Sequence, residues 1–442
     1  MNTAFFSSVV VSWLTFCAQI ALRKVQPEII GVTGSSGKSS CVHAIDVVLS
    51  QLTTKKVKVG KKGNSETGIP MEILGIPVDT YTGLQWLGVC VQAIQKALLY
   101  TQKYDILVLE MGIDSESSPK NMSHLLSFIH PHIGVLLSIS AVHGQNFSGN
   151  DILQSIANEK GKLLTSIPQS GTAIYSVDYP QVLSFLPKIK SQQLTFSSQQ
   201  QPSDFCLIEH SVSFEGTEFL FQHHDKQHSL FLPKSLHFKE SFGTFASAIL
   251  VGIEHGLSIE NSIDRLSKQF QLPPGRMNII DGINECTLID SSYNSSVVPT
   301  TAALRMLMQL PGRKIAILGD MRELGKQAQS DHEQLAAQAA QSADLIVLIG
   351  PLTKQFAVPY LTQHQFPSER LLHFKNAYQA IESLQQLVHK GDVVLIKGSQ
   401  NTIFLEIIVK ALMKHPELAK KLLCRQTPYW EKQRQKILAQ TR

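Results

Sequence analysis

The sequence predicts an α/β protein with two domains, each built on a largely parallel sheet. A chain of 442 residues is too long for one ordinary hydrophobic core. From Glu28 to about Phe270, short apolar runs alternate with helical stretches, and the alternation restarts after the Pro-Pro-Gly turn of LPPGRMNII. We therefore expect a central domain over residues 28–275 and a carboxyl-terminal domain over 276–442, with an apolar helix over 1–27 before them.

The strands of both domains are expected where short apolar runs alternate with helical stretches. In the central domain these runs are EIIGVTG, DILVLEMG, HIGVLLSIS and TAIYSV. Residues 191–235 show period-two stretches instead, and we expect an antiparallel edge there. CTLIDSS, RKIAILGD, ADLIVLIG and DVVLIKGS predict a second, doubly wound, Rossmann-like domain, with a helical, charged tail from Pro416.

Residues 4–22, AFFSSVVVSWLTFCAQIAL, carry no charge and are about long enough to span a bilayer. Their polar residues recur at helical spacing and form a narrow stripe: Ser8, Ser12, Thr15 and Gln19. This pattern favours a helix that packs against protein or lies on a membrane surface over a membrane anchor. We expect contact with a membrane surface or a protein partner through this helix.

The composition indicates a cytoplasmic protein that does not bind nucleic acid. The formal net charge of +5 is spread along the chain without a basic block. The six cysteines lie far apart, with no C-x-x-C pair, so neither a disulfide framework nor a zinc site is expected.

The stretch IIGVTGSSGKSS, residues 29–40, predicts a phosphate-binding loop between a strand and a helix. Its glycines let backbone N–H groups approach phosphate oxygens, and the helix directs its positive end toward them. Lys38 then neutralises phosphate charge, and Ser39 is placed to bind Mg²⁺. The chain departs from G-x-x-x-x-G-K-[ST] at the first glycine, which is Val32 here.

Three further residues follow strands or lie near them in the central domain. Glu110 ends the strand DILVLEMG, where a carboxylate faces a nucleotide site and is a plausible Mg²⁺ ligand. His143 follows HIGVLLSIS by three residues, and spacing alone leaves a structural histidine and a metal ligand both open. Lys160, in NEKGKL, reads by itself as a solvated lysine.

In the second domain, Asp290 and Asp320 follow strands in LIDSSYNSS and LGDMRELG, with Asn294 just beyond the first. Such carboxylates bind ligands at the switch point of a Rossmann-like sheet, or they cap helices. Spacing alone therefore indicates a nucleoside-triphosphate enzyme with two α/β domains.

Taken together, these stretches resemble the Mur ligase family, the ATP-dependent amide ligases of peptidoglycan precursor synthesis. The resemblance rests on GVTGSSGKSS, GNSETGIP, LEMG, the His143 segment with NEKGKL, PPGRM, IDSSYNSS, LGDMRELG and IKGS, in that order. Within the family, DSSYNSS with LGDMRELG is most similar to the members that add D-alanyl-D-alanine to a UDP-muramoyl tripeptide.

The resemblance implies a role for each matching residue. Two Mg²⁺ ions are expected, and Lys160 matches a lysine that family members carry as a carbamate. The implied catalytic residues are Lys38, His143, Lys160 and Arg276, and the implied metal ligands are Ser39, Glu110, His143 and Lys160. The implied ATP-binding residues are Gly34, Ser35, Ser36, Gly37, Lys38, Ser39, Ser40, Asn64, Arg276, Asp290 and Asn294.

The implied mechanism is attack of a substrate carboxylate on the γ-phosphate, followed by attack of an amine on the acyl phosphate. Closure of the second domain, hinged near Gly275 and Arg276, is expected to exclude water.

The chain departs from the family pattern in ways that leave the substrate open. HFKESFGTFASA lacks the asparagines of the adenine-side motif, Ser291 follows Asp290 where an aspartate pair is usual, and Gln400 replaces an arginine after IKGS. Only about 28 residues precede the first strand, where peptidoglycan members carry a UDP-binding domain. A ligase with another carboxylate donor, similar to folylpolyglutamate synthases, and a nucleotide-binding paralogue without ligase activity remain alternatives.

Overall fold

The computed structural model describes residues 3–60, 63–79, 81–141, 146–147, 151–322, 324–399 and 403–441. The chain forms two compact units. The N-terminal unit comprises the described residues up to His210 with Phe219–Leu230 and Lys239–Phe270, and the C-terminal unit comprises Ser211–Glu218, Phe231–Phe238 and the described residues from Gln271 onward.

The central sheet has nine strands in the order β2-β3-β1-β4-β5-β6-β7-β8-β9. The pairs from β2 through β7 are parallel. Short connections then join β7, β8 and β9 as hairpins. The strands are β1 (Glu28–Thr33), β2 (Val57–Val59), β3 (Ile106–Glu110), β4 (Ile133–Leu136), β5 (Thr172–Ser176), β6 (Gln192–Ser197), β7 (Phe205–Val212), β8 (Gly216–His223) and β9 (Lys226–Pro233).

The expected antiparallel edge over residues 191–235 is therefore partly wrong. β6 pairs in parallel with β5, with Thr172 opposite Gln192, because two 3₁₀ turns, Pro180–Ser184 and Leu186–Lys188, carry the chain back before β6 begins. Period-two patterning reports one exposed face of a strand and does not report its direction.

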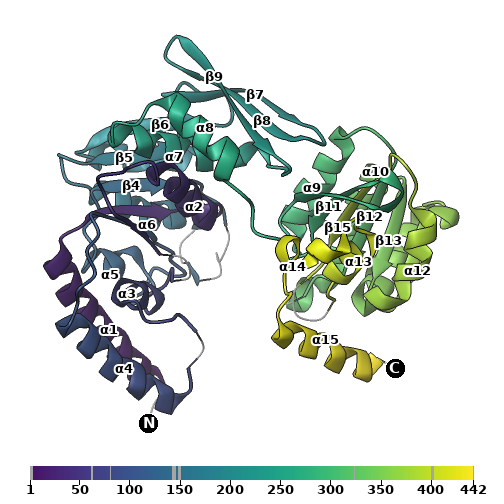
Figure 1. The fold of residues 1–442 in the computed structure, drawn as a ribbon, viewed down its shortest axis with the longest axis horizontal. Helices are drawn as coiled ribbons and strands as arrows, with labels where there is room; N and C mark the ends of the chain where they lie inside the picture. Colours follow the sequence, from purple (N-terminus) through teal and green to yellow (C-terminus); the bar gives the residue numbers. More distant parts are fainter. Residues whose placement is uncertain are drawn as a thin grey trace. The chain divides into compact units, whose positions relative to one another are not determined.

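Helices cover both faces of the central sheet (Figure 1). α7 and α8 pack with α2 on one face, while α1, α3, α4, α5 and α6 share one hydrophobic core on the other. The helices are α1 (Thr3–Val25), α2 (Lys38–Leu49), α3 (Gly68–Leu74), α4 (Gly83–Leu98), α5 (Met122–Leu126), α6 (Ile152–Thr165), α7 (Phe242–Glu254) and α8 (Ile259–Gln269).

α1 is an integral part of the N-terminal unit's packing. Its side chains Leu14, Cys17, Ala18 and Ala21 are fully buried in the core shared with α3 and α4. The window Ser8–Val25 is long and apolar enough to cross a membrane by length and composition, and 44% of it is buried within the protein. The same test is passed by core helices of soluble proteins.

The C-terminal unit is a doubly wound sheet in the order β10-β11-β15-β12-β13-β14, with only β10 antiparallel to its neighbour. α9, α10 and α11 cover one face, and α12, α13 and α14 cover the other, as alternate strand residues require. The strands are β10 (Asn278–Asp281), β11 (Thr287–Ser291), β12 (Lys314–Gly319), β13 (Leu345–Ile349), β14 (Leu371–Phe374) and β15 (Val393–Lys397). The helices are α9 (Val297–Gln309), α10 (Ala328–Ser342), α11 (Val358–Gln363), α12 (Ala377–Leu387), α13 (Glu406–Leu412), α14 (Ala419–Leu422) and α15 (Pro428–Thr441).

Candidate active site

The predicted phosphate loop, residues 34–37, joins β1 to α2 at the carboxyl edge of the central sheet. Gly34 and Gly37 have φ angles of 151° and 82°, which L residues with a Cβ rarely adopt. A Cβ at Gly34 would also lie 3.1 Å from the Cβ of Leu137. These two glycines are therefore required by the turn, and Gly37 directly precedes the first turn of α2.

The loop is held by the segment that follows β4. The backbone N–H of Ser35 donates to the carbonyl of Ser138 at 2.9 Å, and that of Ser36 donates to the Ser138 hydroxyl at 3.0 Å. The Ser35 hydroxyl donates to the carbonyl of Ser140 at 3.1 Å and accepts from its N–H at 2.9 Å. These contacts fix the loop on the side of β4.

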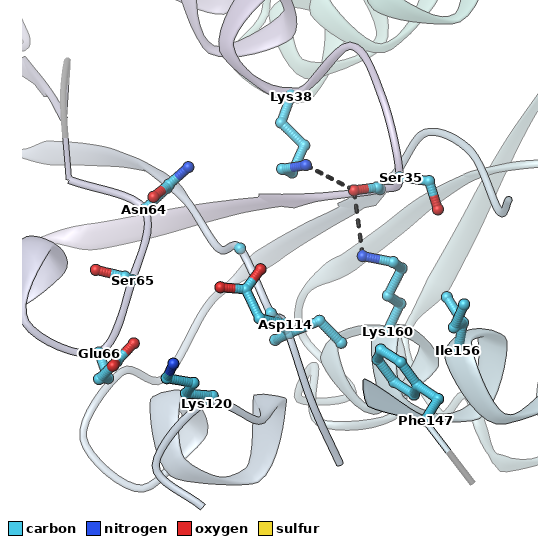
Figure 2. A pocket seen from close by; sticks show the side chains of 13 residues that line it. Ser35, Lys38, Asn64, Ser65, Glu66, Asp114, Lys120, Phe147, Ile156 and Lys160 are labelled. Carbon is cyan, nitrogen blue, oxygen red and sulfur yellow. Dashed lines mark hydrogen bonds between the residues drawn. The ribbon is translucent and has the colours of Figure 1, made fainter. Parts of the chain in front are cut away.

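Two lysines from different elements converge on one carbonyl of this loop. Lys38 Nζ, at the start of α2, donates to the Gly34 carbonyl at 2.9 Å, and Lys160 Nζ, from α6, donates to the same oxygen at 3.2 Å (Figure 2). The helix α6 begins at Asp151, whose carboxylate accepts the N–H of Gln154 at 3.0 Å. The amine groups of two lysines from different elements therefore lie beside the loop.

Burial changes the acidity of both ammonium groups. Burial lowers the pKa of Lys38, and the carboxylates of Glu110 and Asp114 act in the opposite direction. Burial, and then the charge of Lys38, lower the pKa of Lys160 to about 8. Because only 5% of Lys160 is exposed, the sequence-based reading of a solvated lysine is wrong.

Glu110 ends β3 and is held by two predicted site residues. The Ser39 hydroxyl donates to Glu110 Oε2 at 2.7 Å, and Asn64 Nδ2 donates to Oε1 at 3.1 Å. β1 and β3 pair in parallel with Val32 opposite Glu110, so the sheet register brings the carboxylate beside the loop. The backbone of Asn64 is fixed by the N–H of Gly112, which donates to its carbonyl at 2.9 Å.

The side-chain oxygens of Ser39 and Glu110 fit a magnesium ion. A hydroxyl and a carboxylate are the hard oxygen ligands that Mg²⁺ prefers. His143, the third predicted ligand, lies outside the described residues. Within the described ranges, no three His, Cys, Asp or Glu side chains are grouped as a metal site.

The cavity beside the loop also contains residues that the sequence analysis missed: Glu66, Asp114 and Lys120. Figure 2 shows Asp114 directed into the space between the loop lysines and Lys120. Glu66 lies inside the noted motif GNSETG, and Asp114 is the second residue after LEMG, just outside it. Nothing local identified Lys120, whose carbonyl accepts the backbone N–H of Asp114 at 3.2 Å.

In the C-terminal unit, Arg276 and Asp290 have very different environments. The Arg276 guanidinium lies 4.6 Å from the centre of the Tyr293 ring, and its side chain is exposed. Asp290 is fully buried at the end of β11, where Oδ1 accepts the N–H of Ser292 at 3.0 Å and burial raises the pKa to about 6. The Asp320 carboxylate accepts the backbone N–H of Thr353 at 2.8 Å. Of the two roles considered for this residue, ligand binding and helix capping, this contact corresponds to helix capping.

Asn294 is exposed, and its segment is fixed by a lysine that the sequence analysis did not single out. Lys397 Nζ, at the end of β15, donates to the Asn294 carbonyl at 2.9 Å and to the Ser291 hydroxyl at 3.1 Å. Burial is the main cause that lowers the pKa of Lys397 to about 8. The lysine belongs to the IKGS motif, which was the available signal. Gln400 lies outside the described residues.

The family is established by two domain models. Residues 32–235 match the Mur ligase middle domain, and residues 275–400 match the glutamate ligase domain of the Mur ligases. Together the matches cover about three quarters of the chain, in the family's order. The chain belongs to the Mur ligase family and is accordingly an ATP-dependent amide ligase.

Within this family, the chain is similar in sequence to two ligases that carry the same name. The UDP-N-acetylmuramoyl-tripeptide–D-alanyl-D-alanine ligase of Escherichia coli K12 is 25% identical over 398 residues, which are 89% of this chain and 78% of the relative. The Bacillus subtilis 168 enzyme of the same name is 27% identical over 410 residues, or 91% and 80% of the two chains.

Solved structures share the fold. The MurF ligase of Thermotoga maritima in complex with ADP has a TM-score of 0.69 at 22% identity, covering 92% of this chain and 84% of its own. The folylpolyglutamate synthase of Mycobacterium tuberculosis, complexed with ADP and AMPPCP, has a TM-score of 0.59 at 16% identity, with coverages of 88% and 92%.

Proposed function

We propose that this ligase joins D-alanyl-D-alanine to a UDP-muramoyl tripeptide, with ATP converted to ADP and phosphate. The observation that supports it most is the convergence of Lys38 and Lys160 on the Gly34 carbonyl, beside Glu110 held by Ser39. The names of the Escherichia coli and Bacillus subtilis relatives supply the donor and the acceptor.

The protein groups act on charge and position. Backbone N–H groups of the loop, with Lys38, bind the β- and γ-phosphates and reduce their repulsion of an incoming carboxylate. The donor carboxylate attacks the γ-phosphorus, the bond to the β-phosphate oxygen breaks, and ADP leaves. The acceptor amine then attacks the acyl carbon, phosphate leaves with the bonding electrons, and the amine loses a proton to give the amide.

Ser39 and Glu110 are proposed to hold Mg²⁺, with His143 and Lys160 as further ligands. The ion would neutralise phosphate charge during the transfer. Lys160 fits a carbamate because burial favours its neutral amine, which is the form that adds CO₂. The new C–N bond forms as the amine loses one proton, and a cation is replaced by an anion with two oxygen ligands.

The remaining predicted residues stay part of the proposal. Ser35, Ser36, Ser40 and Asn64 are assigned to the phosphates, and Arg276, Asp290 and Asn294 to ATP binding by the C-terminal unit. Because Asp290 is fully buried, we assign it an indirect part, as the residue that fixes the N–H of Ser292. We place the reaction in the cytoplasm, where the nucleotide is available.

The test is phosphate release from Mg-ATP with UDP-muramoyl tripeptide and D-alanyl-D-alanine, supplied together and singly. Release and peptide ligation should require both substrates, should be lost in Lys38→Ala and should persist in Lys188→Ala, an exposed lysine of the same unit. Release only with a folate and glutamate would replace the donor and acceptor named above. ATP binding without release under either condition would refute ligase activity.

A further inference from the structure

The largest gathering of exposed apolar side chains in the described part of the chain lies on α1 and α4. Seven of its seventeen exposed large hydrophobic residues belong to these two helices. We call this set the α1/α4 apolar face: Val9, Trp13, Phe16, Leu84, Leu87, Val91 and Leu98. Exposed residues of this kind are usually scattered singly, so a group on two neighbouring helices indicates an interaction surface.

The two helices lie side by side and are joined by polar contacts (Figure 1). Trp13 Nε1 donates to the carbonyl of Cys90 at 2.9 Å. Lys24 Nζ donates to the carbonyls of Ala97 and Leu98 at 3.0 and 2.6 Å. The contacts progress in the same direction along both helices, so α1 and α4 run parallel.

On α1, the exposed apolar residues lie on the side nearest α4. Val9, Trp13 and Phe16 recur at i, i+4 and i+7, which places them in one stripe. Trp13 itself reaches α4. Gln19 lies on the other side, where its Nε2 donates to the carbonyl of Ser127 at the end of α5.

On α4, the apolar residues likewise lie on the side nearest α1. Leu87, Val91 and Leu98 share the stripe adjacent to Cys90, whose carbonyl accepts from α1. Gln85 and Gln92 occupy the opposite edge of α4, and Gln95 lies beside Val91 at the border of the apolar stripe. The two apolar stripes therefore meet above the line where the helices touch and form one continuous face.

The charge around this face indicates what covers it. Neither α1 nor α4 contains an aspartate or glutamate, while Arg23 and Lys24, the latter already donating to backbone carbonyls, lie at the carboxyl end of α1. Lys96 lies on the other side of α4, where its Nζ donates to the Gly75 carbonyl. A second copy of the same face would bring no acidic partner for these cations. Anionic lipid headgroups would supply it, with the apolar residues and Trp13 at the level where headgroups meet acyl chains.

We propose that the α1/α4 apolar face docks this ligase on the surface of a membrane containing anionic phospholipid. The helices lie on the membrane and do not cross it, because α1 is bound to α3 and α4 through fully buried side chains such as Leu14, Cys17 and Ala18. Crossing the bilayer would require stripping this side of α1 from the protein core.

The experiment is cosedimentation of the full chain with vesicles. One set contains phosphatidylglycerol and phosphatidylcholine in equal parts, and the other contains phosphatidylcholine alone. F16Q/L87Q/V91Q removes three apolar residues that are 50–56% exposed. L183Q/V298Q/M308Q is the matched control at residues that are 50–79% exposed elsewhere on the chain. Thermal unfolding and ATP binding establish that both variants are folded.

The wild-type chain and the control should bind the anionic vesicles, and the face variant should bind at least about tenfold more weakly. Binding should fall with added salt and be weaker to phosphatidylcholine. Equal binding by both variants, or no binding by the wild type, would overturn the proposal. Two other results would also overturn it. One is a wild-type dimer that binds no vesicles and that the face variant converts to monomers. The other is wild-type chain that stays with the vesicles after alkaline carbonate extraction, because such a chain would span the bilayer. Since no substrate is needed, the result is independent of the proposed reaction.

Discussion

Replacing Lys160 by methionine should remove the carbamate that we propose for this side chain. Two features of the structure support that proposal. Lys160 is almost fully buried with a pKa of about 8, and its Nζ shares the Gly34 carbonyl with Lys38. From the two hydrogen-bond lengths, the two nitrogens lie within about 6 Å of each other.

The magnitude follows from these values. At about pH 7.5, a lysine with a pKa near 8 is neutral in about a quarter of molecules, against about one in a thousand for an ordinary lysine. At a fixed concentration of dissolved CO₂, carbamate formation on Lys160 should thus be favoured by about 10²-fold over an ordinary lysine. In addition, at an effective dielectric of about 20, the Lys38 charge stabilises an anion about 6 Å away by about 3 kcal/mol.

The assay is ¹³C NMR of protein equilibrated with ¹³C-bicarbonate at fixed dissolved CO₂. The carbamate signal should grow as the pH rises, because the neutral amine increases from about 3% at about pH 6.5 to about 90% at about pH 9. Lys160→Met should lose the signal and acceptor-dependent phosphate release, and Lys188→Met should keep both. A signal that survives in Lys160→Met, or one that appears only at the alkaline pH at which ordinary lysines form carbamates, would refute the reasoning.

Three further predictions concern other parts of the site and its support. Glu110→Gln should raise the Mg²⁺ concentration needed for half-maximal phosphate release by about tenfold, because a neutral amide replaces a carboxylate; an unchanged requirement in a magnesium titration would contradict this. Lys397→Met should lower kcat/KM by about 10²-fold by loosening the segment after β11, while exposed Lys410→Met has no effect on steady-state kinetics. Glu406→Gln should lower the free energy of unfolding by about 3 kcal/mol in urea titrations, since it leaves buried Arg425 and partly buried Arg434 without a counter-charge, whereas Glu285→Gln, in an exposed pair, should change it by less than about 1 kcal/mol.

The fold class could be predicted because buried parallel strands are long apolar runs. The run DILVLEMG became β3, and DVVLIKGS became β15. β2 was missed because Val57–Val59 is only three residues long and lies in a lysine-rich stretch. β14 (Leu371–Phe374) was missed because a half-buried edge strand needs no continuous apolar pattern.

The strand, glycine turn and helix over residues 28–49 and the place of Glu110 at the end of β3 could be predicted because local sequence fixes them. The state of Lys160 could not, because its burial comes from packing of α6 near the loop, which adjacent residues do not report. Lys120 was missed for the same reason. The resemblance to a known family pointed to Lys160, but the physical reason for its low pKa is visible only in three dimensions.

The segment that follows β11 depends on parts of the chain far from it in sequence. Arg425 donates to the carbonyls of Ser292 and Tyr293 and pairs with buried Glu406, with 3.2 Å between Nη1 and Oε2. The match to the glutamate ligase domain ends at residue 400, so these supports lie beyond it. Because a buried charge is costly unless it is paired, Glu406 stabilises Arg425 in the position from which it holds the backbone of Ser292 and Tyr293. The carboxyl-terminal tail therefore supports the segment of its own unit to which we assign ATP binding.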